Sequence, residues 1–338
     1  MRREYLRLRG AWPLALGVVV GVASLETVAA QPRLDAGGAV EAVQIRPNFY
    51  MIAGAGANIA VAIGVDGVVA VDAGSTDKAD EVVAEIRKLT PQKIRYIINT
   101  SADPDHVGGN EKLSLAGESI VPTGGLNSIA SYGGRAPIVA EEHVQARMSA
   151  PTGRQAKFAE AFWPTTTYSS ALGENRKDMY LNGEAVQIFY QPAAHTDGDS
   201  LVFFRRSDVV VSGDVFDTTR FPVIDIEKGG SVQGVIASLN RMMALVVPPI
   251  PLVWEEGGTA VIPGHGRICN KDDVVNYRDM VTIVRDIVQD MVNKQMTLDQ
   301  IRKADPTKGY RRRYGADSGA WTTDMFVEAV YKSLTREK

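Results

Sequence analysis

The chain changes abruptly from apolar to polar at residues 99–110, which read NTSADPDHVGGN and come directly after the apolar run KIRYII. Such a change is typical of a buried strand that ends in a functional loop. Asp103, Asp105 and His106 fall within four positions, and Pro104 between them and Gly108 and Gly109 after them break regular structure. Carboxylates and an imidazole this close together predict a metal site.

Three further segments share this form, in which an apolar, strand-like run is followed by a polar residue beside glycine. They contain His195 in QPAAHTDGD, Asp214 in DVVVSGDVF and His265 in VIPGHG. The chain has only four histidines, and the remaining one, His143, lies in an acidic, helix-like segment that predicts a surface position. We therefore expect the ends of four strands to meet at one site.

Composition restricts the classes of protein to which the chain can belong. Of its 338 residues, 45% are hydrophobic and 23% are charged, which is typical of a globular protein with a large core. The net charge of −3 gives no basic surface for nucleic acid, and the short run RRR at 311–313 does not alter that. No linker or internal repeat divides the chain, so we expect a single domain over residues 31–338.

The first thirty residues predict an export signal rather than part of the fold. They carry four arginines before an apolar stretch, and small residues precede Gln31 as a cleavage site would require. The start also resembles a twin-arginine signal, and the ordinary secretory route is the alternative, as is an uncleaved anchor. We expect a periplasmic or secreted protein with no stable membrane span after cleavage. Cys269 is the only cysteine, which excludes an intrachain disulfide and favours a buried side chain.

The remaining patterns predict alternating strands and helices. Short β-like runs at 39–74 favour an antiparallel meander, and helical spacing at 78–89 followed by a strand at 93–100 gives a strand–helix–strand unit. Residues 107–130 predict a helix, a strand around 119–123 and another helix, and residues 131–178 predict an insertion with its own aromatics. Three strands, a helix, a strand and two amphipathic helices then follow, at 185–191, 200–206, 208–213, 231–246, 259–264, 272–295 and 322–334.

The order of these motifs, with Asp-His and Val-Gly-Gly-Asn, then AHTDGDS, SGDVF and IPGHG, resembles the metallo-β-lactamase superfamily over almost the whole mature chain. The resemblance implies an α/β fold, a four-layer αββα sandwich with a metal centre at one edge. It also implies an H-x-H-x-D-H signature, whose positions here hold Ser101, Asp103, Asp105 and His106. Both leading histidines of the signature are therefore absent.

The resemblance further implies two metal sites that share Asp214. The first would use Ser101, Asp103 and His195, and the second Asp105, His106 and His265. Because the second set holds two imidazoles and two carboxylates, it suits zinc, and we expect one firm zinc ion there. The first set favours manganese, iron or magnesium, or stays empty.

The function implied is a secreted metallo-hydrolase that acts on a small-molecule ester, thioester, lactone or lactam. Asp105, Asp103 and His195 are the candidate catalytic residues. Asp103 would either bind metal or accept a proton, and a simple turn cap is the alternative for it. A metal-binding accessory protein without turnover and an iron-dependent redox enzyme are the alternative functions, which the fold alone does not decide. The sequence does not indicate an oligomeric state.

Overall fold

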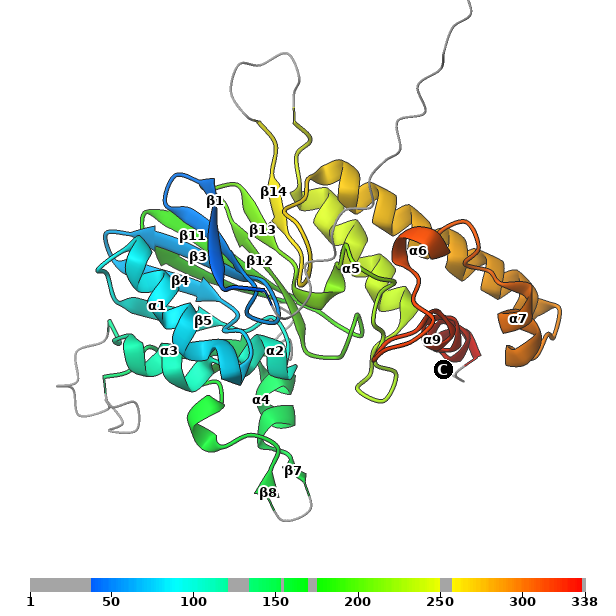
Figure 1. Ribbon diagram of the computed structural model, residues 1–338, viewed down its shortest axis with the longest axis horizontal. Helices are drawn as coiled ribbons and strands as arrows, with labels where there is room; N and C mark the ends of the chain where they lie inside the picture. Colours follow the sequence, from blue (N-terminus) through cyan, green and yellow to red (C-terminus); the bar gives the residue numbers. More distant parts are fainter. Residues whose placement is uncertain (1–37, 121–133, 153–154, 170–174, 250–256, 336–338) are drawn as a thin grey trace, which may run out of the picture. The chain divides into compact units, whose positions relative to one another are not determined.

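Two β-sheets stack face to face in the computed structural model, which describes residues 38–120, 134–152, 155–169, 175–249 and 257–335 (Figure 1). Within these residues the first sheet has seven strands in the order β1 (Glu41–Arg46), β2 (Phe49–Ala53), β3 (Ile59–Gly64), β4 (Gly67–Val71), β5 (Ile94–Ile98), β6 (Ile138–Glu141) and β9 (Thr166–Tyr168). The second has five, in the order β10 (Arg176–Leu181), β11 (Glu184–Gln191), β12 (Asp199–Phe204), β13 (Val209–Val211) and β14 (Ala260–Ile262). A small hairpin joins β7 (Pro151–Thr152) and β8 (Gln155–Ala156).

The alternation of side chains along each strand divides its apolar residues between the core that separates the two sheets and the cores under the outer helices. In β4, Val69 and Val71 face the second sheet, whereas Val68 and Ala70 face the helices on the outer side. In β13, Val209 and Val211 face the first sheet, and Val210 faces outward. Because both faces of these strands are covered, their sequences are continuous apolar runs.

Helices cover the outer face of each sheet, which completes four layers (Figure 1). The first sheet is covered by α1 (Ala79–Leu89) and α3 (Asn110–Ala116), and the second by α5 (Val232–Leu245), α6 (Lys271–Asn293) and α9 (Thr323–Thr335). Shorter helices are α2 (Pro104–Val107), α4 (Glu142–Ser149), α7 (Leu298–Ala304) and α8 (Arg311–Tyr314). The αββα sandwich predicted from the motif order is thus confirmed.

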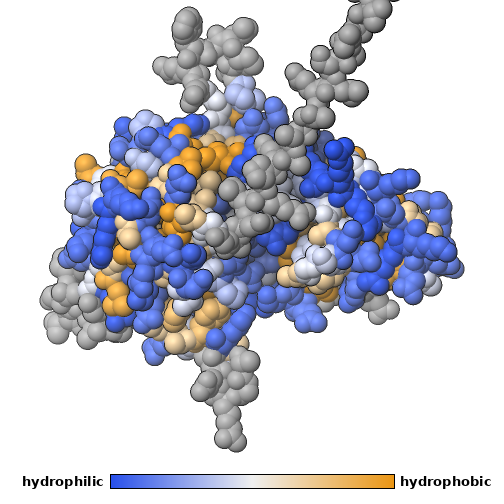
Figure 2. All heavy atoms as spheres, viewed as in Figure 1, coloured by the Kyte–Doolittle hydropathy of each residue, from blue (hydrophilic) through white to orange (hydrophobic). Residues whose placement is uncertain are grey.

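The long helix α6 shows why these coverings form. Its buried side chains include Val274, Tyr277, Val281 and Val288, which recur at helical spacing on one face. A capping box at Asn270 and Asp273 fixes its first turn. Figure 2 shows mainly hydrophilic residues over the outer surface of α6 and α7, as expected for helices packed on one side only.

The predicted meander and the strand–helix–strand unit are observed as β1–β4 and as β4–α1–β5, with β4 and β5 parallel. The segment 131–178 differs in part from the expected insertion, because β6 and β9 extend the first sheet beside β5. Both strands are only three or four residues long, too short for alternation to identify them. Strand β10 was also not predicted.

The strand expected around 119–123 and the helix after it lie largely outside the described residues, as does the predicted export signal at 1–30. Within the described ranges, no helix is both long and apolar enough to cross a membrane.

Candidate metal centre

Four loops at one edge of the sandwich bring together the six predicted ligands. Asp103, Asp105 and His106 follow β5, and the last two lie in α2. His195 lies between β11 and β12, Asp214 in a 3-10 turn after β13, and His265 after β14. Because β4 runs parallel to β5 and β13 parallel to β14, the carboxyl ends of each pair open at the same edge of their sheet.

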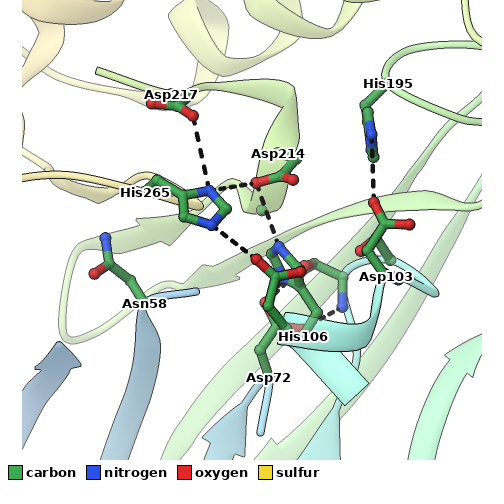
Figure 3. Close-up of polar contacts among 12 residues, drawn as sticks. Asn58, Asp72, Asp103, His106, His195, Asp214, Asp217 and His265 are labelled. Atoms are coloured by element: carbon green, nitrogen blue, oxygen red, sulfur yellow. Dashed lines mark hydrogen bonds and ion pairs between the residues drawn. The ribbon is translucent and has the colours of Figure 1, made fainter. Parts of the chain in front are cut away.

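One cluster contains Asp105, His106 and His265, whose ligand atoms all lie within 4.8 Å of one another. Nε2 of His265 is 2.9 Å from Oδ2 of Asp105, and its Nδ1 is 3.0 Å from Oδ1 of Asp214 (Figure 3). The same Asp214 oxygen is 3.3 Å from Nε2 of His106. Asp214 therefore contacts both histidines of the cluster.

A second cluster contains Asp103, His195 and Asp214, again with ligand atoms within 4.8 Å. Nε2 of His195 is 3.3 Å from Oδ2 of Asp103 (Figure 3). Asp103 occupies the N-cap position of α2, yet its side chain makes no capping hydrogen bond. The buried Ser101 hydroxyl instead accepts a hydrogen bond from the Asp103 backbone at 3.3 Å. The Asp103 side chain thus contacts His195 and does not cap α2, whereas the Ser101 side chain bonds to the backbone of the turn.

Asp72 orients the His106 ring through its Nδ1 atom. This buried residue follows β4 with a φ of 66°, a left-handed conformation that Asp tolerates better than most side chains. Its carboxylate accepts hydrogen bonds from the Thr100 backbone at 2.8 Å and from the Thr100 hydroxyl at 2.7 Å, and lies 2.8 Å from Nδ1 of His106. A proton on Nδ1 therefore leaves the lone pair of Nε2 directed into the site.

Other supporting residues were not predicted. The Asn58 side chain donates to the carbonyls of Pro263 and Gly266, both at 3.0 Å, and so fixes the loop that carries His265. Asp199 accepts from the Thr196 backbone at 2.7 Å and lies 3.5 Å from Nδ1 of His195. The sequence offered a signal only for Asp199, which belongs to the AHTDGDS motif.

Two more unpredicted residues carry charge near the clusters. Asp217 lies 3.7 Å from Nδ1 of His265 and forms an ion pair with Arg220 at 2.7 Å. Lys228 places its Nζ 3.3 Å from Oδ1 of Asp103. No motif surrounds Lys228 in the sequence, so only the tertiary structure reveals that it lies near Asp103.

The carboxylates and imidazoles shift one another's pKa values strongly. Burial opposes the charged form of His265, but Asp214 and Asp105 raise its pKa to about 10. Burial likewise opposes charge on His195, and Asp199 and Asp103 raise its pKa to about 9. For Asp214, burial alone would raise the pKa, yet the two neighbouring histidines hold it well below its usual range.

The residues present fit a metal ion. Four buried atoms at the two clusters make no hydrogen bond within the described part of the chain, namely His106 Nε2, His195 Nδ1, Asp214 Oδ1 and His265 Nδ1. Buried polar atoms without partners are costly, and two imidazoles with two carboxylates form a donor set that divalent metals satisfy. Among the candidate metal-binding clusters of the described residues, only that of Asp105, His106 and His265 holds two imidazoles.

Two stacked sheets with such a donor set at one edge define a class of metal-binding α/β proteins. A family model described as the metallo-beta-lactamase superfamily matches residues 53–252. The chain belongs to the metallo-β-lactamase superfamily.

The comparisons also give particular relatives. A linear primary-alkylsulfatase from Pseudomonas sp. (strain ATCC 19151) is 23% identical over 270 residues, 70% of this chain and 47% of that protein. The solved sec-alkylsulfatase Pisa1 from Pseudomonas sp. has a TM-score of 0.59 at 13% identity, covering 87% of this chain and 50% of that one. A metallo-beta-lactamase from Pontibacter korlensis has a TM-score of 0.52 at 13% identity, covering 72% and 99%. The chain thus spans about half the length of the alkylsulfatases it resembles.

Proposed function

We propose that the protein hydrolyses a small-molecule ester at a centre with one firmly held metal ion, zinc by donor type. Asp105, His106, Asp214 and His265 would hold it. The observation that carries this proposal is the contact of one Asp214 oxygen with both histidines, beside Asp105. A bound metal of this kind supplies a water activated near neutral pH and polarises the bond to be cleaved.

The residues of the second cluster supply the remaining functions. Asp103 and His195 face each other across 3.3 Å at the side of the site away from His265 (Figure 3). Asp103 is 17% exposed, so a substrate can reach it, whereas His195 is buried. We assign to this pair the positioning of the substrate and the acceptance of a proton from the attacking water.

Among the possible esters, sulfate esters are the substrate class to test first. The alkylsulfatase similarity supports this choice, although it covers only about half of those proteins. Carboxylic esters, thioesters, lactones and lactams are the other classes that the superfamily resemblance implies. A protein that binds metal but hydrolyses none of them would instead support the accessory-protein alternative.

The test is metal analysis of purified protein followed by assays on one chromogenic substrate of each class. We expect zinc bound after dialysis and hydrolysis that a chelator abolishes and added zinc restores. The variants His106→Ala and His265→Ala should lose both metal and activity, whereas the distant control Lys112→Met, which removes an exposed ion pair with Asp80, should lose neither. A wild-type protein that retains no transition metal would overturn the proposal.

We also propose that the protein is exported and that its mature form begins near Gln31. The charged start, apolar stretch and small residues before this position support the proposal. Intact mass of the protein recovered from cell fractions of its native host is the test. A cytoplasmic species that retains Met1 would refute it.

A further inference from the structure

Asp103 is shared between an imidazole and an ammonium group. Its Oδ2 lies 3.3 Å from Nε2 of His195, and its Oδ1 lies 3.3 Å from Nζ of Lys228. Lys228 also forms an ion pair with Asp225, at 2.8 Å. A fixed positive charge therefore already lies beside the carboxylate that the first metal site would need.

The loop that carries Lys228 is anchored to the loop that carries His195. The Asp225 backbone donates to the His195 carbonyl, and the Asp197 backbone donates to the Lys228 carbonyl, both at 2.9 Å. The Arg147 guanidinium, which is ion-paired with Asp197, donates to the same Lys228 carbonyl at 2.7 Å. These bonds hold the lysine backbone at a set distance from the cluster.

The glycine at 230 shows how closely the two loops pack. A Cβ on Gly230 would overlap the carbonyl oxygen of His195, so only glycine permits this approach. The Lys228 side chain is 30% exposed, and its ammonium group lies between the carboxylates of Asp103 and Asp225. Its placement beside Asp103 is therefore a built feature of the fold and not a chance surface contact.

The first cluster, next to the Lys228 ammonium group, offers few strong metal ligands. The cluster has a single imidazole, His195, and Ser101 is engaged by the backbone of Asp103. A divalent ion there would have to share Asp103 with a cation that repels it and that neutralises its ligand. By contrast, the cluster around His106 and His265 has no ammonium contact within the described residues.

We propose that the ammonium group of Lys228 replaces the first-site metal ion, so that the centre combines one metal with one fixed organic cation. In this arrangement Lys228 supplies positive charge on the side of Asp103 and His195, where it would bind an electronegative oxygen of the substrate. This use of the charge rests on the proposed hydrolytic function, whereas the replacement of the metal does not.

The experiment compares metal content in three full-length variants loaded with manganese and dialysed. Lys228→Met removes the charge at similar length, Lys228→Arg keeps it, and Lys112→Met is the control for loss of an exposed lysine. We expect about one ion per chain in wild type, Lys228→Arg and Lys112→Met, and about two in Lys228→Met, because carboxylate-rich sites suit manganese. Electron paramagnetic resonance should then show spin coupling only in Lys228→Met, since paired ions in two-metal sites lie about 3.5–4 Å apart.

Equal metal content in wild type and Lys228→Met, at one ion or at two, would overturn the inference. A second ion in Lys228→Arg would also overturn it, because the charge would then not be what excludes the metal. Circular dichroism establishes that each variant is folded. If wild type holds one ion and Lys228→Met two, but wild type hydrolyses no substrate, the proposed function fails and the metal replacement stands.

Discussion

Replacing Asp72 by asparagine should both destabilise the protein and weaken metal binding. The carboxylate accepts two hydrogen bonds from Thr100 and contacts Nδ1 of His106, all within 2.8 Å and away from solvent. An asparagine keeps one acceptor oxygen but presents an NH₂ group to at least one buried donor. It also tolerates the left-handed backbone at this position, so the change isolates the hydrogen bonds and the charge.

The magnitude follows from the groups left unpaired. One buried donor without a partner costs about 1–3 kcal/mol, and loss of charge-assisted bonds adds to this, giving about 2–4 kcal/mol in total. At about 2.1 cal/mol/K of unfolding entropy per residue, that corresponds to a fall in Tm of roughly 3–6 °C for a chain of 338 residues. Because Asp72 orients a ligand, metal affinity should fall by about 10- to 100-fold.

The assays are urea unfolding of metal-depleted protein and competition for zinc with a chromophoric chelator. Asp80→Asn is the matched control, since its exposed pair with Lys112 should change stability by less than about 0.5 kcal/mol. Asp72→Ala should be less stable than Asp72→Asn by about 1 kcal/mol or more, because alanine is strained at positive φ. If Asp72→Asn unfolds more readily but binds zinc as tightly as wild type, Asp72 does not orient His106 and the reasoning is refuted.

Three further predictions concern the ligands. His106→Ala should lose most of its metal on dialysis, whereas Asp103→Ala should retain about one ion per chain. The reason is that only His106 belongs to the cluster with two imidazoles. Equal losses of metal from the two variants would contradict this. Folding raises the pKa of His195 to about 9 and that of His265 to about 10, so the charged imidazoles stabilise the metal-free protein. This stabilisation is complete below about pH 6.5 and is lost as the pH rises through 9 to 10. Thermal melts of chelator-treated protein should therefore show a falling Tm over that range, and titration calorimetry in two buffers should show proton release on zinc binding near pH 7; no release would contradict the assignment. The double change Ser101→His with Asp103→His should raise zinc content towards two per chain, because it supplies two imidazoles and removes the carboxylate that holds Lys228 at the first cluster; unchanged content would count against the first site.

The sequence predicted the residues whose signal is local. Asp214 and His265 each follow a strand that is a continuous apolar run buried on both faces, and Asp105 and His106 follow the mainly apolar strand IRYII. The ends of these strands can therefore be located without any tertiary information. The αββα layers could be predicted from the order of such runs and of amphipathic segments like that of α6. The roles of Asn58 and Lys228 could not be predicted, because each lies in a loop that no local sequence pattern places near the site.

Asp103 shows how a site residue can depart from local preference. An aspartate directly before Pro104 at the start of a helix ordinarily caps that helix, and losing such a cap costs about 1 kcal/mol. Here the Asp103 carbonyl accepts from the backbones of His106 and Val107, while its carboxylate turns away from the helix to His195 and Lys228. Two charged or chargeable partners thus outweigh one backbone hydrogen bond, since charge-assisted contacts in a partly buried site are stronger. Because α2 lacks this cap, the orientation of Asp103 does not serve the stability of the helix, and it is the orientation that the proposed centre requires.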